Sequence, residues 1–369
     1  MHAHRRLLCP FLPYLLFAGF LPAAELTRVS VTSTADGTEQ PVHVILPEGF
    51  DPNGKPVPLL VSLHTWSNGV EQRHPVVEQE AAKRGWICLS PQFRGPNRNP
   101  GACASAAARQ DILDAVDWAI ATYSVDKDRI YLTGSSGGGH MALVMAGRHP
   151  NRWTAVSAWV PITDLAAWQR FHGEKSYGKN VIDVCGGKPG DSPEVDKQYY
   201  ERSPIHFLQN AAGLPLEIAA GIHDGHTGSV PIRHALEAFN VIAKAVQAPL
   251  VTEEEIRQLS RPDGRLARPK PSDQEADPTY KRDIYLRRTA GKARVTIFEG
   301  GHERLDEAAV EWLSRQGATQ PRPCHTEVHG EGKKLEGTAP APTDESGLED
   351  EYLRPEQEKR QHRSQQEGN

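Results

Sequence analysis

A serine between glycines has the surroundings of a catalytic nucleophile. Residues 134–138 read Gly-Ser-Ser-Gly-Gly, so Ser136 is the central residue of a G-x-S-x-G pattern. The pattern follows the β-rich run 130–133 and opens a small-residue stretch, 138–146, that is typical of a helix. Glycines permit the tight strand-to-helix turn, and amides at a helix N-terminus stabilise developing negative charge. A Gly-Ser string is also typical of flexible linkers, but the flanking strand and helix favour Ser136 as a nucleophile.

Two residues further along the chain have the placement of its partners. A serine hydroxyl needs a base to accept its proton and a carboxylate to orient that base. Asp224 follows the apolar run 216–221, and His302 follows the run 295–298. The order serine, acid, histidine is that of serine enzymes with this elbow, and residues just after parallel strands gather at one sheet edge. We therefore expect Ser136, Asp224 and His302 to form a catalytic triad.

Other histidines and carboxylates compete for these roles. His223 and His226 flank Asp224 and suit either a loop position or a substrate contact. His140 lies one helical turn beyond Ser136, where packing is its expected role. Asp164 also follows a strand-like run and is the alternative acid.

An acyl-transfer site also needs donors for the oxyanion. One is expected to be the backbone N–H of Gly137, the residue after the nucleophile. The second should come from the loop after the strand that ends at residue 63, from the Thr65 or Trp66 amide. Trp66 would also form a wall of the acyl pocket, or would cover apolar surface.

The remaining pocket candidates are polar. They are His64, Arg94, Ser135 and His226, together with Trp66. Arg94 follows a strand end, where an arginine contacts a carboxylate or sulfate of the substrate or ties down its own loop.

Strand and helix patterns alternate through the chain from about residue 26. Apolar runs that predict strands occur at 29–32, 42–46, 59–63, 86–89, 130–133, 155–160, 216–220 and 295–298. Stretches with helical spacing occur at 76–83, 105–122 and 138–146. Such alternation predicts an α/β fold with a mostly parallel central β-sheet flanked by helices on both faces. We expect one catalytic domain spanning 26–316.

Three segments interrupt this alternation. The aromatic-rich stretch 166–214 is expected to form a cap over the site. The stretch 252–292, rich in charge and proline, is interpreted as a surface insertion before the last strand. The stretch 317–369 is polar, with almost no large apolar residue, and is expected to be disordered.

The first residues resemble an export signal. Arg5 and Arg6 precede the apolar stretch 11–21, and small residues follow it, which predicts a signal peptide over 1–24 and a secreted or periplasmic protein. The apolar stretch is too short for a convincing membrane anchor.

Four cysteines follow the predicted signal and allow three complete pairings. They are Cys88, Cys103, Cys185 and Cys324. Cys88 lies in an apolar run and is expected to be a buried strand residue. Cys103 and Cys185 both fall in Gly-rich stretches that are expected to be loops, where a disulfide between them would suit an exported protein.

Composition excludes some classes of partner. A formal net charge of −5 gives no electrostatic reason to expect a nucleic acid or an anionic membrane. No cluster of cysteines or histidines has the spacing of a metal site, and a serine triad requires no cofactor. The oligomeric state stays open.

Several segments resemble the prolyl oligopeptidase family of α/β-hydrolases and its single-domain esterase relatives. The matching segments are 91–95, 110–112, 128–138, Asp224 with 230–231, and Gly301-His302. The resemblance implies a Ser136–Asp224–His302 triad that hydrolyses an acyl bond. The stretch 252–292 makes the interval between aspartate and histidine longer than is usual in the family.

These features leave three functional interpretations. The first is a carboxylic-ester hydrolase that deacylates a polysaccharide or a plant-derived ester. The second is a serine peptidase that cleaves short peptides through the same acyl-enzyme. The third is an inactive binding protein with a hydrolase fold, which would be expected to lack a member of the triad. In each case the partner is a small molecule, a polysaccharide ester or a short peptide.

Overall fold

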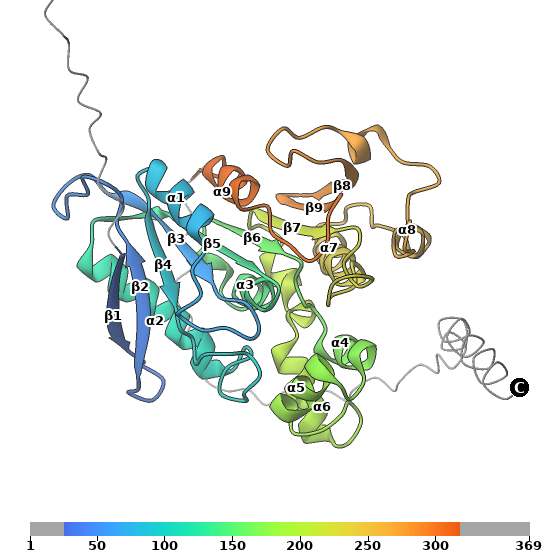
Figure 1. Ribbon diagram of the computed structural model, residues 1–369, viewed down its shortest axis with the longest axis horizontal. Coiled ribbons are helices and arrows are strands. Elements are labelled where there is room, and N and C mark those ends of the chain that lie inside the picture. The colour runs from blue at the N-terminus through green and yellow to red at the C-terminus, as the bar shows by residue number, and fades with distance from the viewer. Residues whose placement is uncertain (1–25, 318–369) are drawn as a thin grey trace, which may run out of the picture. The chain divides into compact units, whose positions relative to one another are not determined.

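The computed structural model describes residues 26–317 (Figure 1). The predicted signal peptide, the predicted disordered tail and Cys324 lie outside the described residues. Within 26–317, no helix combines the length and the apolar character needed to cross a bilayer.

Nine strands of the described chain form one sheet, in the order β1-β2-β4-β3-β5-β6-β7-β9-β8. Their bounds are β1 Leu26–Thr32, β2 Glu39–Ile45, β3 Val57–Leu63, β4 Ile87–Pro91, β5 Val125–Ser135, β6 Ala155–Trp159, β7 Leu216–Gly221, β8 Ile284–Ala290 and β9 Ala293–Phe298. The six central strands β4, β3, β5, β6, β7 and β9 pair in parallel. At the two edges of the sheet, β1, β2 and β8 pair antiparallel with their neighbours. The predicted mostly parallel sheet is confirmed.

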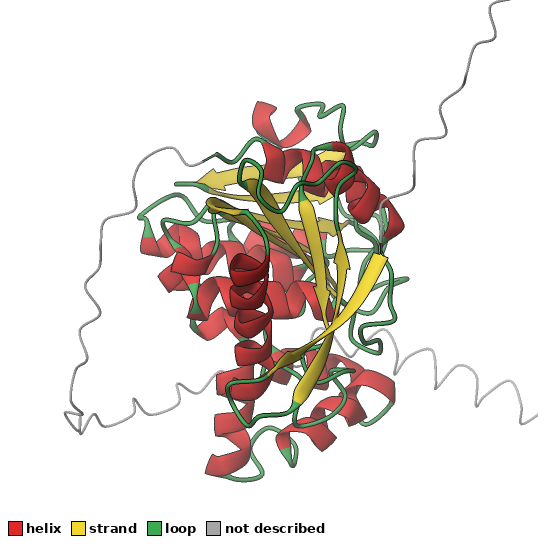
Figure 2. Ribbon diagram, turned by 90° about the vertical axis from the view of Figure 1, so that its left-hand side faces the viewer, coloured by secondary structure: helices red, strands yellow, loops and turns green. Residues whose placement is uncertain are grey.

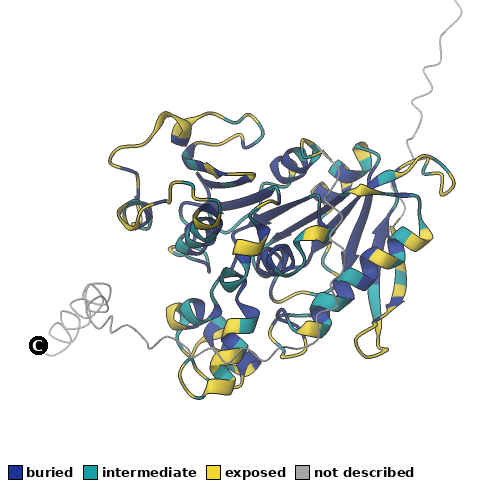
Figure 3. Cartoon of the chain, turned by 180° about the vertical axis from the view of Figure 1, so that it is seen from behind, coloured by how far each residue is buried: buried dark blue, intermediate teal, exposed yellow. Residues whose placement is uncertain are grey.

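Helices cover both faces of this sheet (Figure 2). Their bounds are α1 Pro75–Lys83, α2 Ala106–Thr122, α3 Gly137–Arg148, α4 Leu165–His172, α5 Ser176–Cys185, α6 Pro193–Arg202, α7 Arg233–Ala245, α8 Glu253–Leu259 and α9 Asp306–Ser314. α1 and α9 bury one face around Leu60, Cys88 and Tyr131, and α2, α3 and α7 bury the other. Because both faces are covered, the central strands are apolar runs rather than alternating ones (Figure 3).

The interpretation of 252–292 as a surface insertion was only partly right. Its end forms β8, which pairs antiparallel with β9 at the sheet edge. Alternate residues of this strand are buried, as expected for an edge strand with one covered face. The two arginines of β8 interrupt the apolar alternation that would predict a strand. In the structure Arg287 pairs with Asp277, and Arg288 pairs with Glu255. The loop between α8 and β8 is largely exposed (Figure 3).

The expected cap consists of α4, α5 and α6, which follow β6. Asp164 caps the N-terminus of α4, because its carboxylate accepts hydrogen bonds from the Ala166 and Ala167 amides. The cap has its own apolar cluster, which includes Trp168 and Tyr199 and extends to Trp66 of the sheet domain. The cap is therefore packed against the loop that follows β3.

The proposed disulfide between Cys103 and Cys185 was wrong. Both side chains are free thiols buried in the cap cluster, and Cys185 ends helix α5 instead of lying in a loop. Burial raises the pKa of each thiol to about 12, so both are uncharged and pack as small apolar groups. Cys88 is a buried residue of β4, as predicted.

A buried carboxylate connects the centre of the sheet to the segment before β8. The Glu217 side chain on β7 is fully buried and pairs with Arg294 on β9. It also accepts hydrogen bonds from the Ser157 hydroxyl at 2.7 Å and from the Tyr280 hydroxyl at 3.0 Å. All of these donors lose their charged acceptor if Glu217 is removed, and an unpaired buried charge is costly.

We therefore expect Glu217→Ala to lower the free energy of unfolding by about 3–5 kcal/mol. The matched control is Glu174→Ala, since Glu174 pairs with Lys188 at an exposed site and should change stability far less. Urea denaturation of both variants measures the difference. Equal effects of the two substitutions would show that Glu217 does not hold the sheet in this way.

Candidate active site

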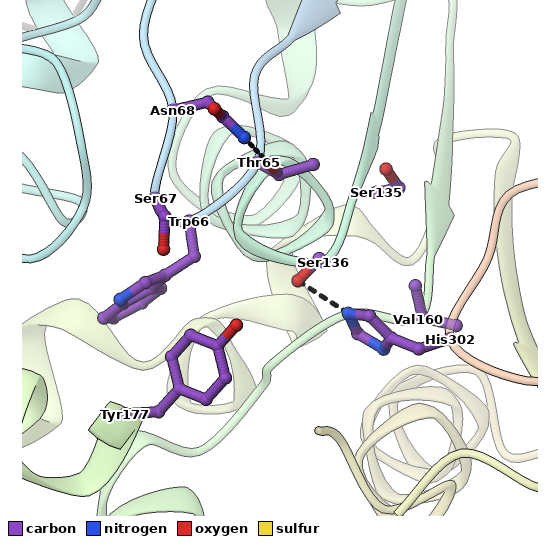
Figure 4. A pocket seen from close by; sticks show the side chains of 9 residues that line it. All are labelled: Thr65, Trp66, Ser67, Asn68, Ser135, Ser136, Val160, Tyr177 and His302. Atoms are coloured by element: carbon purple, nitrogen blue, oxygen red, sulfur yellow. Dashed lines mark hydrogen bonds between the residues drawn. The ribbon is translucent and has the colours of Figure 1, made fainter. Parts of the chain in front are cut away.

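Three side chains predicted to act together lie at the carboxyl ends of neighbouring parallel strands. Ser136 follows β5, Asp224 follows β7, and His302 follows β9. The Ser136 hydroxyl donates to Nε2 of His302 at 2.8 Å (Figure 4), and Nδ1–H of His302 donates to Oδ2 of Asp224 at 2.7 Å. The structure thus brings the three residues together although they are far apart in the sequence.

Asp224 is held rigidly enough to fix the imidazole. Its side chain is fully buried, and its Oδ1 accepts hydrogen bonds from the Gly225 and Val230 amides, each at 3.0 Å. Its Oδ2 is therefore directed at His302. Because the carboxylate accepts a hydrogen bond from Nδ1–H, Nε2 of a neutral His302 has a free lone pair for the Ser136 proton.

Ser136 occupies a strained backbone conformation. Its φ of 57° and ψ of −120° lie outside the regions that side chains other than glycine prefer. The strain is held by the Ser136 amide, which donates to the Trp159 carbonyl at 2.9 Å, and by the start of α3 at the next residue. This turn directs the hydroxyl away from the sheet toward His302, as a nucleophile elbow requires.

The backbone of Gly137, the residue after Ser136, lies against the backbone of Trp66. A Cβ added to Gly137 would lie 2.5 Å from Cα of Trp66, so the two backbones meet without room for a side chain. The Gly137 amide belongs to the first turn of α3 and has no partner within the helix. The Thr65 amide is already bonded to Oε1 of Gln72 at 2.7 Å, so the Trp66 amide is the better placed of the two amides that the sequence left open.

Asn97 holds the two oxyanion loops together. It is fully buried, its amide donates to the Trp66 carbonyl at 2.7 Å, and its Nδ2 lies 3.4 Å from the Gly137 carbonyl. Its Oδ1 accepts from the Cys103 amide at 3.2 Å. Nothing in the sequence marks this asparagine, which lies in a loop rich in proline and glycine. Only the tertiary contacts reveal its role.

A pocket of about 220 Å³ opens in front of Ser136 (Figure 4). Its lining residues are Thr65, Trp66, Ser67, Asn68, Ser135, Ser136, Val160, Tyr177 and His302. Trp66 and Tyr177 form an aromatic side, and the hydroxyls and amide of the 65–68 loop form a polar side (Figure 4). Tyr177 comes from the cap, where it stacks on Trp168 with the ring centroids 5.1 Å apart. The cap thus supplies one wall of the pocket.

Comparison with known proteins supports this fold. The model of the prolyl oligopeptidase family matches residues 104–254, which contain Ser136 and Asp224. Acylaminoacyl peptidase of Pyrococcus horikoshii superposes with a TM-score of 0.56 at 15% identity, covering 82% of this chain and 43% of that one. The chain has an α/β-hydrolase fold, and its residues 104–254 are similar to the prolyl oligopeptidase family.

Curated relatives of this α/β-hydrolase include esterases. Feruloyl esterase B of Talaromyces stipitatus is 26% identical over 234 residues, which are 59% of this chain and 57% of that protein. Acetylxylan esterase A of Emericella nidulans is 41% identical over 120 residues, or 32% of each chain. The matches thus span only part of these relatives.

Three of the predicted pocket residues of the hydrolase lie outside the lining. Arg94 donates to Asp111 and to Asp36, each at 2.6 Å, and so ties down its own loop. His64 is buried against Phe93, and its Nε2 donates to the Gln92 carbonyl at 2.7 Å. His226 bonds to the Ser260 carbonyl at 3.0 Å. Arg94 thus has the second of its two expected roles, whereas His64 and His226 bond to carbonyls of the chain and lie outside the pocket lining.

The rival histidines of the hydrolase also have structural partners. His223 pairs with Glu299 through Nε2 at 2.7 Å. His140 donates from Nε2 to the Arg202 carbonyl at 2.7 Å, and burial lowers its pKa to about 4. It is therefore uncharged at neutral pH and has the packing role that was expected of it.

Gly228 is a site residue that sequence reasoning missed. A Cβ at this position would lie 2.7 Å from Cβ of His302 and would also overlap Oδ1 of Asp224. Only glycine lets the loop pass behind the Asp224–His302 pair. The only sequence feature that points to this role is the position of Gly228, four residues after Asp224. From the sequence alone it cannot be told apart from an ordinary turn glycine.

We expect Gly228→Ala to displace His302 and to reduce hydrolysis of 4-nitrophenyl acetate by at least about 100-fold, in line with the loss from misplaced reacting groups. The matched control is Gly213→Ala, because a Cβ there meets no atom within 4 Å. Circular dichroism shows whether each variant is folded. A folded Gly228→Ala variant with normal activity would contradict the geometry described for this pair.

Proposed function

We propose that the chain is an exported carboxylic-ester hydrolase that works through an acyl-enzyme on Ser136. The observation that carries this proposal is the continuous hydrogen-bonded series from Asp224 through His302 to Ser136, next to the closely packed backbones of Gly137 and Trp66. These are the parts that acyl transfer requires: a nucleophile, an oriented base and oxyanion donors. Export rests on the sequence of residues 1–24.

Acylation follows from the positions of these groups. His302 Nε2 takes the Ser136 proton as the serine oxygen adds to the ester carbonyl carbon. The amides of Gly137 and Trp66 receive the resulting oxyanion. The tetrahedral intermediate then collapses, the alcohol leaves with the proton from Nε2, and the acyl group stays on Ser136.

Hydrolysis of the acyl-enzyme repeats the same steps with water. His302 accepts a proton from the water as its oxygen adds to the acyl carbonyl. Collapse of the second intermediate returns the proton to Ser136 and releases the carboxylic acid. Asp224 stabilises the imidazolium that forms transiently in both halves of the reaction.

The lining of the pocket supports an ester substrate with a planar or small acyl group. Trp66 and Tyr177 offer flat apolar surfaces, and the hydroxyls on the opposite side suit a hydroxylated leaving group such as a sugar. None of the nine described lining residues is a carboxylate, lysine or arginine, so the pocket has no fixed charge to bind a peptide terminus. The feruloyl and acetylxylan esterases among the relatives agree with this choice.

A peptidase that cleaves short peptides is the second candidate, since the fold is shared with acylaminoacyl peptidase. The same acyl-enzyme chemistry would serve both substrates. A non-catalytic binding protein agrees less well, because it would not need a complete hydrogen-bonded series at Ser136.

We expect His302→Ala to lower kcat for an activated ester by at least about 10⁴-fold, because the hydroxyl then has no base. The matched control is His226→Ala, which removes a neighbouring histidine whose ring bonds to a surface carbonyl and should retain full activity. Initial-rate kinetics with 4-nitrophenyl acetate measure both. A His302→Ala enzyme within tenfold of the parent would rule out the proposed base.

Assays of one preparation against matched esters and amides decide between the two candidates. We expect methyl hydroxycinnamates or acetylated xylan to be hydrolysed, and aminoacyl 4-nitroanilides to react far more slowly. Amide turnover above ester turnover would overturn the order proposed here.

The aromatic wall gives a further test. Tyr177→Ala should raise KM for a hydroxycinnamate ester by about 3–10-fold, because an aromatic contact contributes about 0.5–1.5 kcal/mol beyond its buried area. KM for an acetyl ester, which does not reach the ring, should change by less than twofold. Equal changes for both esters would show that Tyr177 does not contact the acyl group.

A further inference from the structure

A second hydroxyl lies beside the imidazole nitrogen that accepts the Ser136 proton. The Ser229 hydroxyl is 3.4 Å from Nε2 of His302, a long hydrogen bond, while Ser136 bonds to the same nitrogen at 2.8 Å. Ser229 does not belong to the triad or the oxyanion loops. It lies on the loop between Asp224 and α7, and its neighbour Val230 donates its amide to Asp224.

The cap fixes the position of Ser229. Its carbonyl accepts a hydrogen bond from Nε1 of Trp168 and another from Nε2 of His172, each at 2.8 Å. Both donors lie on α4, and both rings contact Tyr177, which lines the pocket. The Ser229 carbonyl is thus bonded twice to α4, and the next amide, that of Val230, is bonded to Asp224. These bonds hold Ser229 between the cap and the Asp224–His302 pair.

We propose that Ser229 is a positioning residue for the hydrolytic half of the reaction, an inference that rests on the proposed acyl-enzyme. In that intermediate the Ser136 oxygen is bonded to the acyl carbon and has no proton to donate. The lone pair of His302 Nε2 then needs a new donor. A water molecule that donates to Nε2 and bonds to the Ser229 hydroxyl is held by two protein groups instead of one.

The step is balanced without any further reagent. The water gives one proton to Nε2 as its oxygen forms a bond to the acyl carbonyl carbon. The bond from that carbon to the Ser136 oxygen then breaks, and the oxygen takes the proton back from Nε2. The products are a carboxylic acid and free enzyme. Ser229 exchanges no proton, but its hydroxyl restricts where the attacking oxygen lies.

This role separates the two halves of the reaction. Removing the Ser229 hydroxyl leaves Ser136, His302 and the oxyanion amides unchanged, so formation of the acyl-enzyme should keep its rate. Hydrolysis should slow, because one hydrogen bond to the attacking water is lost. A residue that only supports the fold of the loop would instead slow both halves, since it would move His302.

The experiment uses the full chain and 4-nitrophenyl N-methylcarbamate, which forms a carbamoyl-enzyme that hydrolyses slowly. Released nitrophenol gives the rate of formation, and intact mass after desalting follows the loss of the carbamoyl group. For Ser229→Ala we expect formation within about twofold and decay slowed about tenfold, the loss of roughly one hydrogen bond. Trp168→Phe keeps an aromatic ring at this position but removes the Nε1 donor to the Ser229 carbonyl. This variant should slow decay by a smaller factor.

Thr227→Ala is the matched control. Thr227 is on the same loop, but its hydroxyl bonds to the His223 carbonyl, so both rates should stay unchanged. Unchanged decay in Ser229→Ala, or formation and decay slowed equally, would overturn the role of Ser229. If the parent enzyme never gains the carbamoyl mass on Ser136, the proposed function itself fails, which is a different result.

Discussion

The hydrogen bond between the buried Asp224 carboxylate and Nδ1 of His302 determines how the rest of the site is arranged. It fixes which imidazole nitrogen carries the proton, and so leaves Nε2 to Ser136. Two amides hold the other carboxylate oxygen, and Gly228 leaves space for the pair. The parallel order β5, β6, β7 and β9 is what brings these loops together.

The hydrogen-bonded series of Ser136, His302 and Asp224 was predictable because each residue follows an apolar strand. Their types, chain order and positions after strands were enough to select Ser136, Asp224 and His302 from many serines, carboxylates and histidines. The fold class followed from the same alternation of strands and helices. These are local patterns, and a buried parallel sheet displays them clearly in a single sequence.

The errors arose where a residue's role depends on a partner distant in sequence. Asp36 and Asp111 decide which of the two expected roles Arg94 has, and Asn97 binds two loops that no spacing relates to it. Strand β8 was hidden because its arginines are neutralised by acids from other segments. The cysteine pair failed because helix α5 extends to Cys185 and packs both thiols into an apolar cluster.

The cap contributes both to the pocket and to the geometry at His302. Tyr177 forms a wall, while Trp168 and His172 hold the Ser229 carbonyl. Changes in α4 would then alter substrate fit and hydrolytic rate together. The site is therefore shared between the sheet domain and the cap, although Ser136, Asp224 and His302 all lie on segments that directly follow strands of the sheet.

The most direct measurement is mass spectrometry of the intact and digested protein after reaction with a fluorophosphonate, which traps an activated serine. The account predicts a single adduct, located on Ser136, formed quickly at neutral pH. An adduct on another serine, or no adduct in a preparation that hydrolyses esters, would contradict the assignment of Ser136 as the nucleophile.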